Sequence, residues 1–237
     1  WQSLLSSPIP AIPSSVHTII IGGEALEANA LSAWIGRQET LPRLFNTYGP
    51  TETTVVATVA ECIGTVPSIG RPISNTQIYL LDASGQPVPL GVTGEIHIAG
   101  AGVARGYLNR AELTAERFIA NPFSTDVGAR MYKTGDLGRY LPDGNIEFLG
   151  RNDHQVKIRG FRVELGEIEA VLAKQEGVGT VAVILRQEQG VDQLIAFIVR
   201  ETTASAETVA DSIHRLRQAL SQVLPAYMVP SRRSEEH

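Results

Sequence analysis

The stretch GRNDHQVKIRGFRVELGEIE (residues 150–169) divides the chain into two differently organised parts. Basic and acidic side chains are interleaved along it, a pattern that a solvated face would also show. Gly150, Gly160 and Gly166 interrupt the charges, as if the backbone had to bend or approach another group there. The residue pattern changes at about residue 154, so we expect two domains, residues 1–152 and 153–237.

The first part begins with a predicted strand, turn and helix. HTIIIGG (17–23) is a β-branched run ended by two glycines. EALEANALSAWIGR (24–37) follows, with Leu26, Ala30, Ala33 and Trp34 near helical spacing. RLFNTYGP (43–50) and TTVVATVAEC (53–62) are predicted strands that flank the loop NTYGPTETT (46–54).

Short extended runs broken by turn residues occupy residues 76–150, which is typical of a β-barrel or sandwich. In GEIHIAG (94–100), Ile96 and Ile98 alternate with polar or small residues, which predicts a half-buried strand. One helix interrupts this stretch. Asn109 is expected to cap it, with Glu112 at the third helical position and Leu113 and Phe118 facing inward.

The second part reads as a small α+β domain. ELGEIEAVLAKQ (164–175) predicts a helix, and VGTVAVILR (178–186) and QLIAFIVRE (193–201) predict a hairpin whose connection contains Gly190. ETVADSIHRLRQALSQVL (207–224) predicts a second amphipathic helix. The residues expected to face inward are Leu165, Ile168, Val171 and Leu172 in the first helix, and Val209, Ile213, Leu216, Leu220 and Val223 in the second.

Composition narrows the class of protein. The chain has 237 residues, 43% of them apolar, and a net charge of −5. The charge shows no footprint of nucleic-acid binding, and no window approaches eighteen consecutive apolar residues, so neither nucleic acid nor membrane is an expected partner. The N-terminus lacks a secretory pattern, and the single cysteine, Cys62, fits a reducing compartment; we expect a cytoplasmic protein.

The loop NTYGPTETT carries groups suited to a nucleotide. Tyr48 offers a ring for stacking on a base, and the Asn46 amide can donate to and accept from a heterocycle. Gly49 sets a sharp turn, Thr51 offers a hydroxyl to a phosphate, and Glu52 offers an oxygen ligand to magnesium. The alternative is a polar strand–turn–strand with a solvated glutamate, which is the more common explanation for an isolated loop.

Two further stretches are ambiguous by themselves. Asp136 in YKTGDL (132–137) could accept hydrogen bonds from both hydroxyls of a ribose, or belong to an ordinary Gly-Asp turn. The glycines of GAGVARGYL (100–108) do not meet the G-x-G-x-x-G spacing of dinucleotide sites, since position 105 is arginine. Turns at strand ends are the better interpretation of these glycines.

Taken together, the ordered stretches resemble the amino-acid adenylation domain of nonribosomal peptide synthetases, within the adenylate-forming enzymes. They are NTYGPTETT, GEIHIAGAGVARGYLNRAELTAERFI, YKTGDL, GRNDHQVKIRGFRVELGEIE and LPAYMVP, and the resemblance covers residues 17–230. It implies a mixed α/β fold that is the C-terminal part of a large adenylation core, a sheet and helix layer plus a small β-barrel. A small α+β C-terminal subdomain, truncated at its end, would follow.

The resemblance also implies roles for single residues in ATP binding. Asn46 and Tyr48 would hold and stack the adenine beside the Gly49 turn, and Thr51 would touch the α-phosphate. Glu52 would coordinate Mg2+, so Thr51 and Glu52 count as catalytic. The ribose would bind at Asp136, with Phe148 beside the sugar and Arg151 assisting at the ribose or phosphate.

Further roles concern the amino acid and the mobile subdomain. The pocket positions implied are Ile20, Gly22, Thr47, Val55 and Val56, whose apolar character suggests a neutral apolar or aromatic amino acid. Asp153 would be the hinge about which the small subdomain rotates, with Lys157 as a further catalytic residue. The face from Lys157 through Arg159 to Arg162 would shape a tunnel for a phosphopantetheine arm, and Gly160 would let the backbone approach it.

The implied reaction is ATP-dependent formation of an aminoacyl-AMP, which a carrier-protein thiol then captures; a condensation domain would be adjacent in the synthetase. The family's phosphate loop and amino-group-binding aspartate lie upstream of the matching stretches, and its final lysine follows LPAYMVP. None is found here, and SRRSEEH lacks the apolar strand pattern, so we expect the 237 residues alone to be inactive. Two alternatives stay open: an acyl- or aryl-acid-activating ligase of the same superfamily, and a non-enzymatic remnant that exposes apolar faces near residues 1–60.

Overall fold

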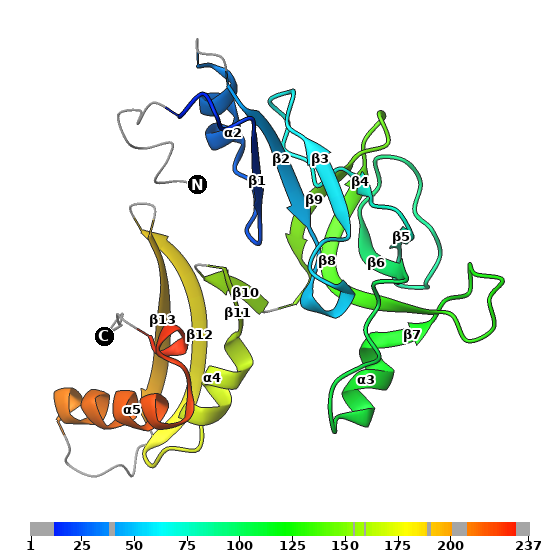
Figure 1. Cartoon of the computed structure of the whole chain (residues 1–237). Helices are drawn as coiled ribbons and strands as arrows, with labels where there is room; N and C mark the ends of the chain where they lie inside the picture. The colour runs from blue at the N-terminus through cyan, green and yellow to red at the C-terminus, as the bar shows by residue number, and fades with distance from the viewer. Residues whose placement is uncertain are drawn as a thin grey trace. The chain divides into compact units, whose positions relative to one another are not determined.

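The computed structural model describes residues 12–37, 41–153, 155–158, 160–188, 191–200 and 208–230. The chain forms two compact units, Trp1–Asn152 and Asp153–His237 (Figure 1). Both combine strands and helices, and the mixed α/β fold class expected from the sequence is confirmed. Among the described residues, no helix has the length and apolar character needed to cross a membrane.

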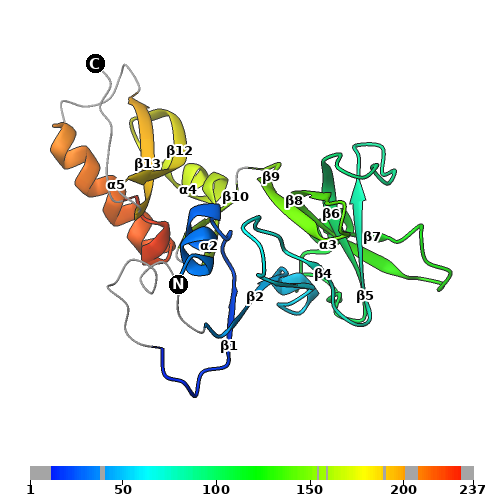
Figure 2. The same cartoon turned by 90° about the horizontal axis from the view of Figure 1, so that it is seen from above.

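The first unit opens with the predicted strand–helix–strand. β1 (Thr18–Gly22) runs parallel to β2 (Arg43–Tyr48), and α2 (Ala28–Ile35) connects them (Figure 2). Leu31 and Trp34 of the helix are buried with Leu44 of β2, whereas Ala33 is exposed. The helix is shorter than the predicted stretch, and Leu31, which the expected spacing did not include, is buried where Ala33 is not.

The strand expected over residues 53–62 starts later than predicted. β3 (Thr58–Glu61) pairs antiparallel with β2 and then with β4 (Arg71–Pro72), giving the sheet order β1-β2-β3-β4. Before it, η1 (Thr51–Thr53) is a single 3-10 turn, and Thr54 and Val55 both have a left-handed backbone. The β-propensity of the threonines and valines is therefore overridden by the turn.

A five-stranded antiparallel sheet follows, in the order β5-β6-β8-β7 with β9 also paired to β8. β6 is buried on both faces rather than half-buried, because Ile96 and Ile98 join one core cluster while Ala99 joins another and His97 is also buried. The strands are β5 (Thr76–Leu81), β6 (Gly94–Gly100), β7 (Phe118–Ala120), β8 (Arg130–Tyr140) and β9 (Ile146–Arg151).

The helix of this region, α3 (Ala111–Arg117), starts differently from the prediction. Asn109 lies in the left-handed region at φ 55°, and Arg110 occupies the N-cap position without a side-chain hydrogen bond. Phe118 is buried, but as the first residue of β7, and Leu113 is only partly buried. The asparagine thus shapes the turn before the helix instead of capping it.

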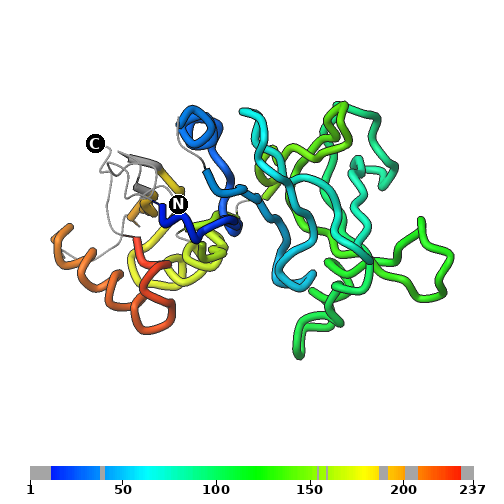
Figure 3. The backbone as a smooth tube through the Cα atoms, turned by 45° about the horizontal axis from the view of Figure 1, so that its top comes forward, coloured from blue at the N-terminus to red at the C-terminus, as the bar shows by residue number. Residues whose placement is uncertain are grey.

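The second unit contains a hairpin, β10 (Gln155–Ile158) with β11 (Phe161–Glu164), and then α4 (Leu165–Leu172). The long antiparallel pair β12 (Val178–Glu188) and β13 (Val191–Arg200) follows as predicted, although Gly190 lies outside the described residues. Figure 3 traces this unit from α4 through the pair to α5 (Val209–Val223) and η2 (Ala226–Met228).

One core holds this unit together. Leu165, Ile168 and Leu172 of α4 are buried with Leu216 and Leu220 of α5, as the helical spacing predicts. Val171 is partly buried against the same core, and Ile213 is also partly buried. Val209 and Val223, in the first and last turns of α5, are exposed, so the buried stripe is shorter than the sequence pattern. The terminal SRRSEEH lies outside the described residues.

Candidate functional site

Three residues from distant stretches meet in the first unit. The Tyr48 hydroxyl at the end of β2 donates to Asp136 Oδ2 at 2.6 Å, although 88 positions separate the two residues. Arg151 on β9 stands in register with Asp136 on β8; it donates to Asp136 Oδ1 and, at 3.0 Å, to the Thr134 carbonyl. Asp136 therefore lies inside a strand, and the alternative Gly-Asp turn is wrong.

This carboxylate is buried, with 5% of the residue exposed. Burial, and then the neighbouring Asp136 charge, raise the pKa of Tyr48 well above its ordinary value, so the phenol stays protonated and donates. The Arg151 guanidinium provides the opposite charge that a buried carboxylate requires. Tyr48, Asp136 and Arg151 thus form one paired polar group.

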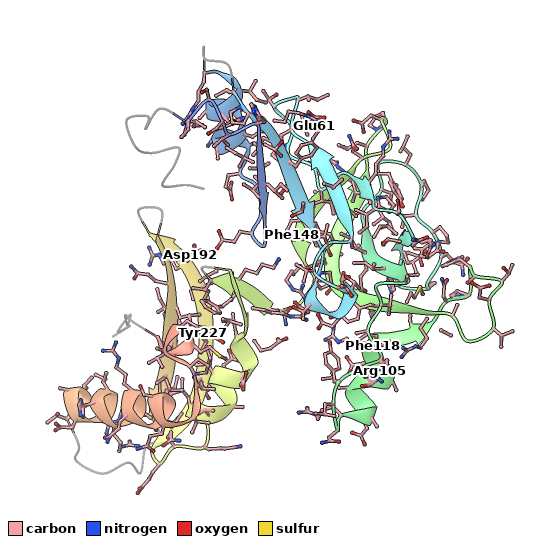
Figure 4. The ribbon with its side chains drawn as sticks, in the orientation of Figure 1. Glu61, Arg105, Phe118, Phe148, Asp192 and Tyr227 are labelled. Carbon is pink, nitrogen blue, oxygen red and sulfur yellow. The ribbon has the colours of Figure 1, made fainter. Side chains whose placement is uncertain are left out.

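Aromatic and amide groups flank that group. The ring centroid of Phe148, which Figure 4 labels on β9, lies 6.1 Å from that of Tyr48, with the planes inclined by 40°. Asn46 shares the buried face of β2 with Tyr48, and its side-chain amide donates to the Ser68 carbonyl at 2.7 Å. The structure therefore gathers Asn46, Tyr48, Asp136, Phe148 and Arg151 in one region of the first unit.

Glu52 lies in η1, just beyond the Gly49 turn. Its Oε1 atom accepts from the Tyr107 hydroxyl at 2.6 Å and from the Tyr132 hydroxyl at 2.9 Å. Both tyrosines lie in stretches quoted from the sequence above, GAGVARGYL and YKTGDL. No pattern in the sequence predicted that their hydroxyls would meet at the Glu52 carboxylate. Burial, and then the bonds to Glu52 and Tyr132, raise the pKa of Tyr107, so this hydroxyl also remains a donor.

The turn before Glu52 has no space for a side chain at Gly49. A Cβ there would lie 2.6 Å from Ala57 N and 2.7 Å from Val55 O. Thr51 is exposed at the start of η1. The backbone geometry thus explains the glycine and places the Thr51 side chain at the surface.

The expected pocket residues divide into two groups. Gly22 and Thr47 stand in register on β1 and β2, and a Cβ on Gly22 would lie 2.4 Å from Thr47 Oγ1. Ile20, on the same face of β1 as Gly22, is 68% exposed. Val55 and Val56 follow η1; Val55 is also 68% exposed and Val56 is partly buried.

The candidate residues of the second unit lie at its first hairpin. Asp153 Oδ1 accepts from Gln155 N at 3.1 Å, and Lys157 on β10 stands in register with Arg162 on β11. The Phe161 ring stacks on that of Tyr227, labelled in Figure 4, with centroids 4.2 Å apart. Arg159 lies outside the described residues.

Two family descriptions match the chain on either side of the boundary. Residues 1–108 match "AMP-binding enzyme", and residues 167–234 match "AMP-binding enzyme C-terminal domain". The chain belongs to the AMP-binding enzymes.

Curated relatives of this AMP-binding chain are much longer than the chain itself. It is 49% identical to malpinin synthetase of Mortierella alpina over 231 residues, which are 92% of the chain and 3% of the synthetase. It is 48% identical to a dimodular nonribosomal peptide synthase of Bacillus subtilis over 237 residues, which are 98% of the chain and 9% of the synthase. The AMP-binding chain thus spans less than a tenth of either relative.

Solved structures about 30% identical to the chain share its fold. The crystal structure of IdnL1 has a TM-score of 0.83 and 30% identity, covering 98% of this chain and 48% of IdnL1. PA1221, a nonribosomal peptide synthetase protein containing adenylation and carrier domains, has a TM-score of 0.77 and 31% identity, covering 94% of this chain and 44% of PA1221. The AMP-binding chain thus spans less than half of these structures.

Oxygen donors of the kind that magnesium uses lie in η1, at Thr51 and Glu52. In the part of the chain that the structure describes, no group of three His, Cys, Asp or Glu side chains could hold a metal. Magnesium is commonly bound by one or two carboxylates together with substrate phosphates. Glu52, with the Thr51 hydroxyl beside it in sequence, has the donor chemistry for the protein's share of such a site.

Proposed function

We propose that this chain forms the adenosine-binding half of an amino-acid adenylation domain in a nonribosomal peptide synthetase. The observation that carries the proposal is the contact between Tyr48 and Asp136, reinforced by Arg151. This contact brings Tyr48, a ring that could stack on a base, next to Asp136, a carboxylate that could bind the ribose of the same nucleotide. The named relatives support the synthetase context.

The proposed roles follow from the chemistry of each group. Asn46 and Tyr48 hold and stack the adenine, and Phe148 packs beside the sugar. Asp136 binds the ribose hydroxyls, and Arg151 assists at the ribose or phosphate. Thr51 contacts the α-phosphate, and Glu52 binds Mg2+, which neutralises phosphate charge. ATP supplies the reactive α-phosphorus, where the amino-acid carboxylate attacks and pyrophosphate leaves.

We further propose that the open face near Ile20, Gly22 and Thr47, with Val55 and Val56, contributes to a pocket for a neutral apolar or aromatic amino acid. None of these five residues carries a charge that could pair with a charged amino acid, so a charged side chain would be disfavoured once the pocket is closed. The second unit would rotate about Asp153 and present Lys157 and the Arg162 face to a phosphopantetheine arm on a carrier protein.

The test uses the complete adenylation domain that contains this chain. Wild type should catalyse pyrophosphate exchange into ATP that depends on an amino acid, and Asp136→Asn should weaken ATP binding by about tenfold or more, because a hydrogen-bonded charge is lost. Asp143→Asn, in an exposed turn, is the matched control and should bind ATP normally. Exchange with acyl or aryl acids alone would favour the related ligases, and no nucleotide binding would contradict both enzymatic functions.

A further inference from the structure

Glu52 is held by side chains that come from two other parts of the first unit. Tyr107 follows β6, Tyr132 lies on β8, and their hydroxyls are 3.3 Å apart. Both hydroxyls donate to the same oxygen, Glu52 Oε1. The two bonds converge on a single carboxylate oxygen from two directions, so they restrict how the Glu52 carboxylate can rotate.

The two phenols are themselves held firmly. The Tyr132 residue is fully buried, and its ring lies 5.1 Å from that of Phe118. Phe118 also contacts Tyr107 edge-on, with centroids 5.3 Å apart. The Tyr107 amide donates to Thr114 Oγ1 at 2.9 Å. The hydroxyls are thus presented from a packed aromatic cluster rather than from mobile side chains.

The backbone around Glu52 is fixed by other bonds. The Ala104 amide donates to the Glu52 carbonyl at 2.8 Å, and Thr54 Oγ1 donates to the Gly102 carbonyl at 2.7 Å. These contacts already join the loop of residues 100–107 to η1. The phenol hydroxyls act on the carboxylate itself, so they add an orientation of the side chain to the fixed position of its backbone.

We propose that Tyr107 and Tyr132 are positioning residues that orient the Glu52 carboxylate, so that one oxygen binds the divalent cation of a metal–nucleotide complex. The inference rests on the proposed function of the same site. Outer hydrogen bonds of this kind fix the orientation of a metal ligand, and their removal commonly weakens metal affinity by about 10–100-fold.

The experiment measures metal binding without turnover. Mn2+ is titrated by electron paramagnetic resonance into the complete domain saturated with α,β-methylene-ATP, for wild type, Tyr107→Phe, Tyr132→Phe and the double variant. We expect the double variant to bind Mn2+ about tenfold more weakly, with each single variant between it and wild type. The affinity for α,β-methylene-ATP in the absence of metal should stay unchanged. A variant whose fold is merely destabilised would lose that affinity as well.

Two controls separate the possible failures. Tyr140→Phe removes a hydroxyl that donates to the Ile78 carbonyl at 3.0 Å and should leave Mn2+ affinity unchanged. Glu52→Gln should lose most of that affinity. If Glu52→Gln loses it and the double phenylalanine variant does not, the positioning role is refuted while the proposed function stands. If Glu52→Gln binds Mn2+ like wild type, the magnesium site and this inference both fail.

Discussion

Tyr48 contributes to the first unit through both of its ends. Its ring belongs to a core cluster with Ile78 and Ile96, and its hydroxyl reaches the buried Asp136 carboxylate. A phenylalanine could replace the ring, but it would leave Asp136 Oδ2 without this donor. Removing a hydrogen bond to a charged group costs more than removing one to a neutral acceptor.

We therefore predict that Tyr48→Phe lowers the free energy of unfolding by about 1.5–3 kcal/mol, the range for bonds to charged groups. Tyr140→Phe, which removes a bond to the neutral Ile78 carbonyl, should cost about 0.5–1.5 kcal/mol. Urea denaturation of the whole chain, followed by tryptophan fluorescence and circular dichroism, measures both. If the two variants lose the same free energy of unfolding, the bond from Tyr48 to the charged Asp136 is no stronger than a bond to a neutral carbonyl.

For single residues, the sequence predicted which chemical groups the site contains better than it predicted their hydrogen-bond partners. Asn46, Tyr48 and Asp136 were identified as polar groups for a nucleotide, and the structure brings them together. The bonds of Asn46 to Ser68, and of Glu52 to Tyr107 and Tyr132, were not predicted. Each joins residues at least 22 positions apart, and such pairs depend on how strands and loops pack in the folded unit rather than on local pattern.

Among the elements, the turn between β2 and η1 depends on Gly49. The chain doubles back so closely that a Cβ at this position would meet the backbone of Ala57 and Val55. Left-handed Thr54 and Val55 complete the turn. Because Glu52 lies inside it, the position of the candidate metal ligand follows from this backbone path.

Gly49→Ala should destabilise the chain by about 1–3 kcal/mol, the usual cost of forcing extra atoms into a packed site. Gly64→Ala is the matched control, because its Cβ would meet nothing within 4 Å; its free energy of unfolding should be nearly that of wild type. Chemical denaturation compares the two, and hydrogen exchange at residues 48–58 should report the local change. A neutral Gly49→Ala variant would mean that the turn relaxes easily.

Elements with strong periodicity were predicted well, and elements set by single turns were not. The hairpin of β12 and β13 and the buried face of α4 follow directly from apolar spacing. The predicted Asn109 cap of α3 was wrong because Asn109 adopts a left-handed backbone. The strand predicted over residues 53–62 was wrong at residues 53–57, where a turn takes its place. The predicted burial of Val209 and Val223 was wrong, because helical spacing does not show how far along α5 its neighbours extend.

On the scale of the whole chain, the two units have separate cores. The clusters containing Leu31, Ile96 and Met131 belong to residues before Asn152, and the cluster containing Ile168 belongs to residues after it. Each unit therefore has its own source of hydrophobic stabilisation. A cavity in one core should have little direct effect on packing in the other.

We predict that Ile168→Ala lowers the stability of the second unit by about 2–5 kcal/mol, as for other large-to-small core substitutions. Hydrogen exchange monitored by mass spectrometry should show lost protection in α4, β12 and β13, with β6 and β8 unchanged. The reciprocal variant Ile96→Ala should affect β6 and β8 alone. Loss of protection in both units from either variant would show that they unfold as one.

The pairing of Asp136 with Tyr48 and Arg151 bears on how the site distinguishes one sugar from another. Without a nucleotide, this carboxylate already accepts from both neighbours. A deoxyribose that lacks one hydroxyl would therefore leave the acceptor satisfied, and 2′-deoxy-ATP should bind only modestly more weakly than ATP. Removing the phenol donor with Tyr48→Phe should widen the ratio of the two dissociation constants. An unchanged ratio would mean that sugar discrimination arises elsewhere.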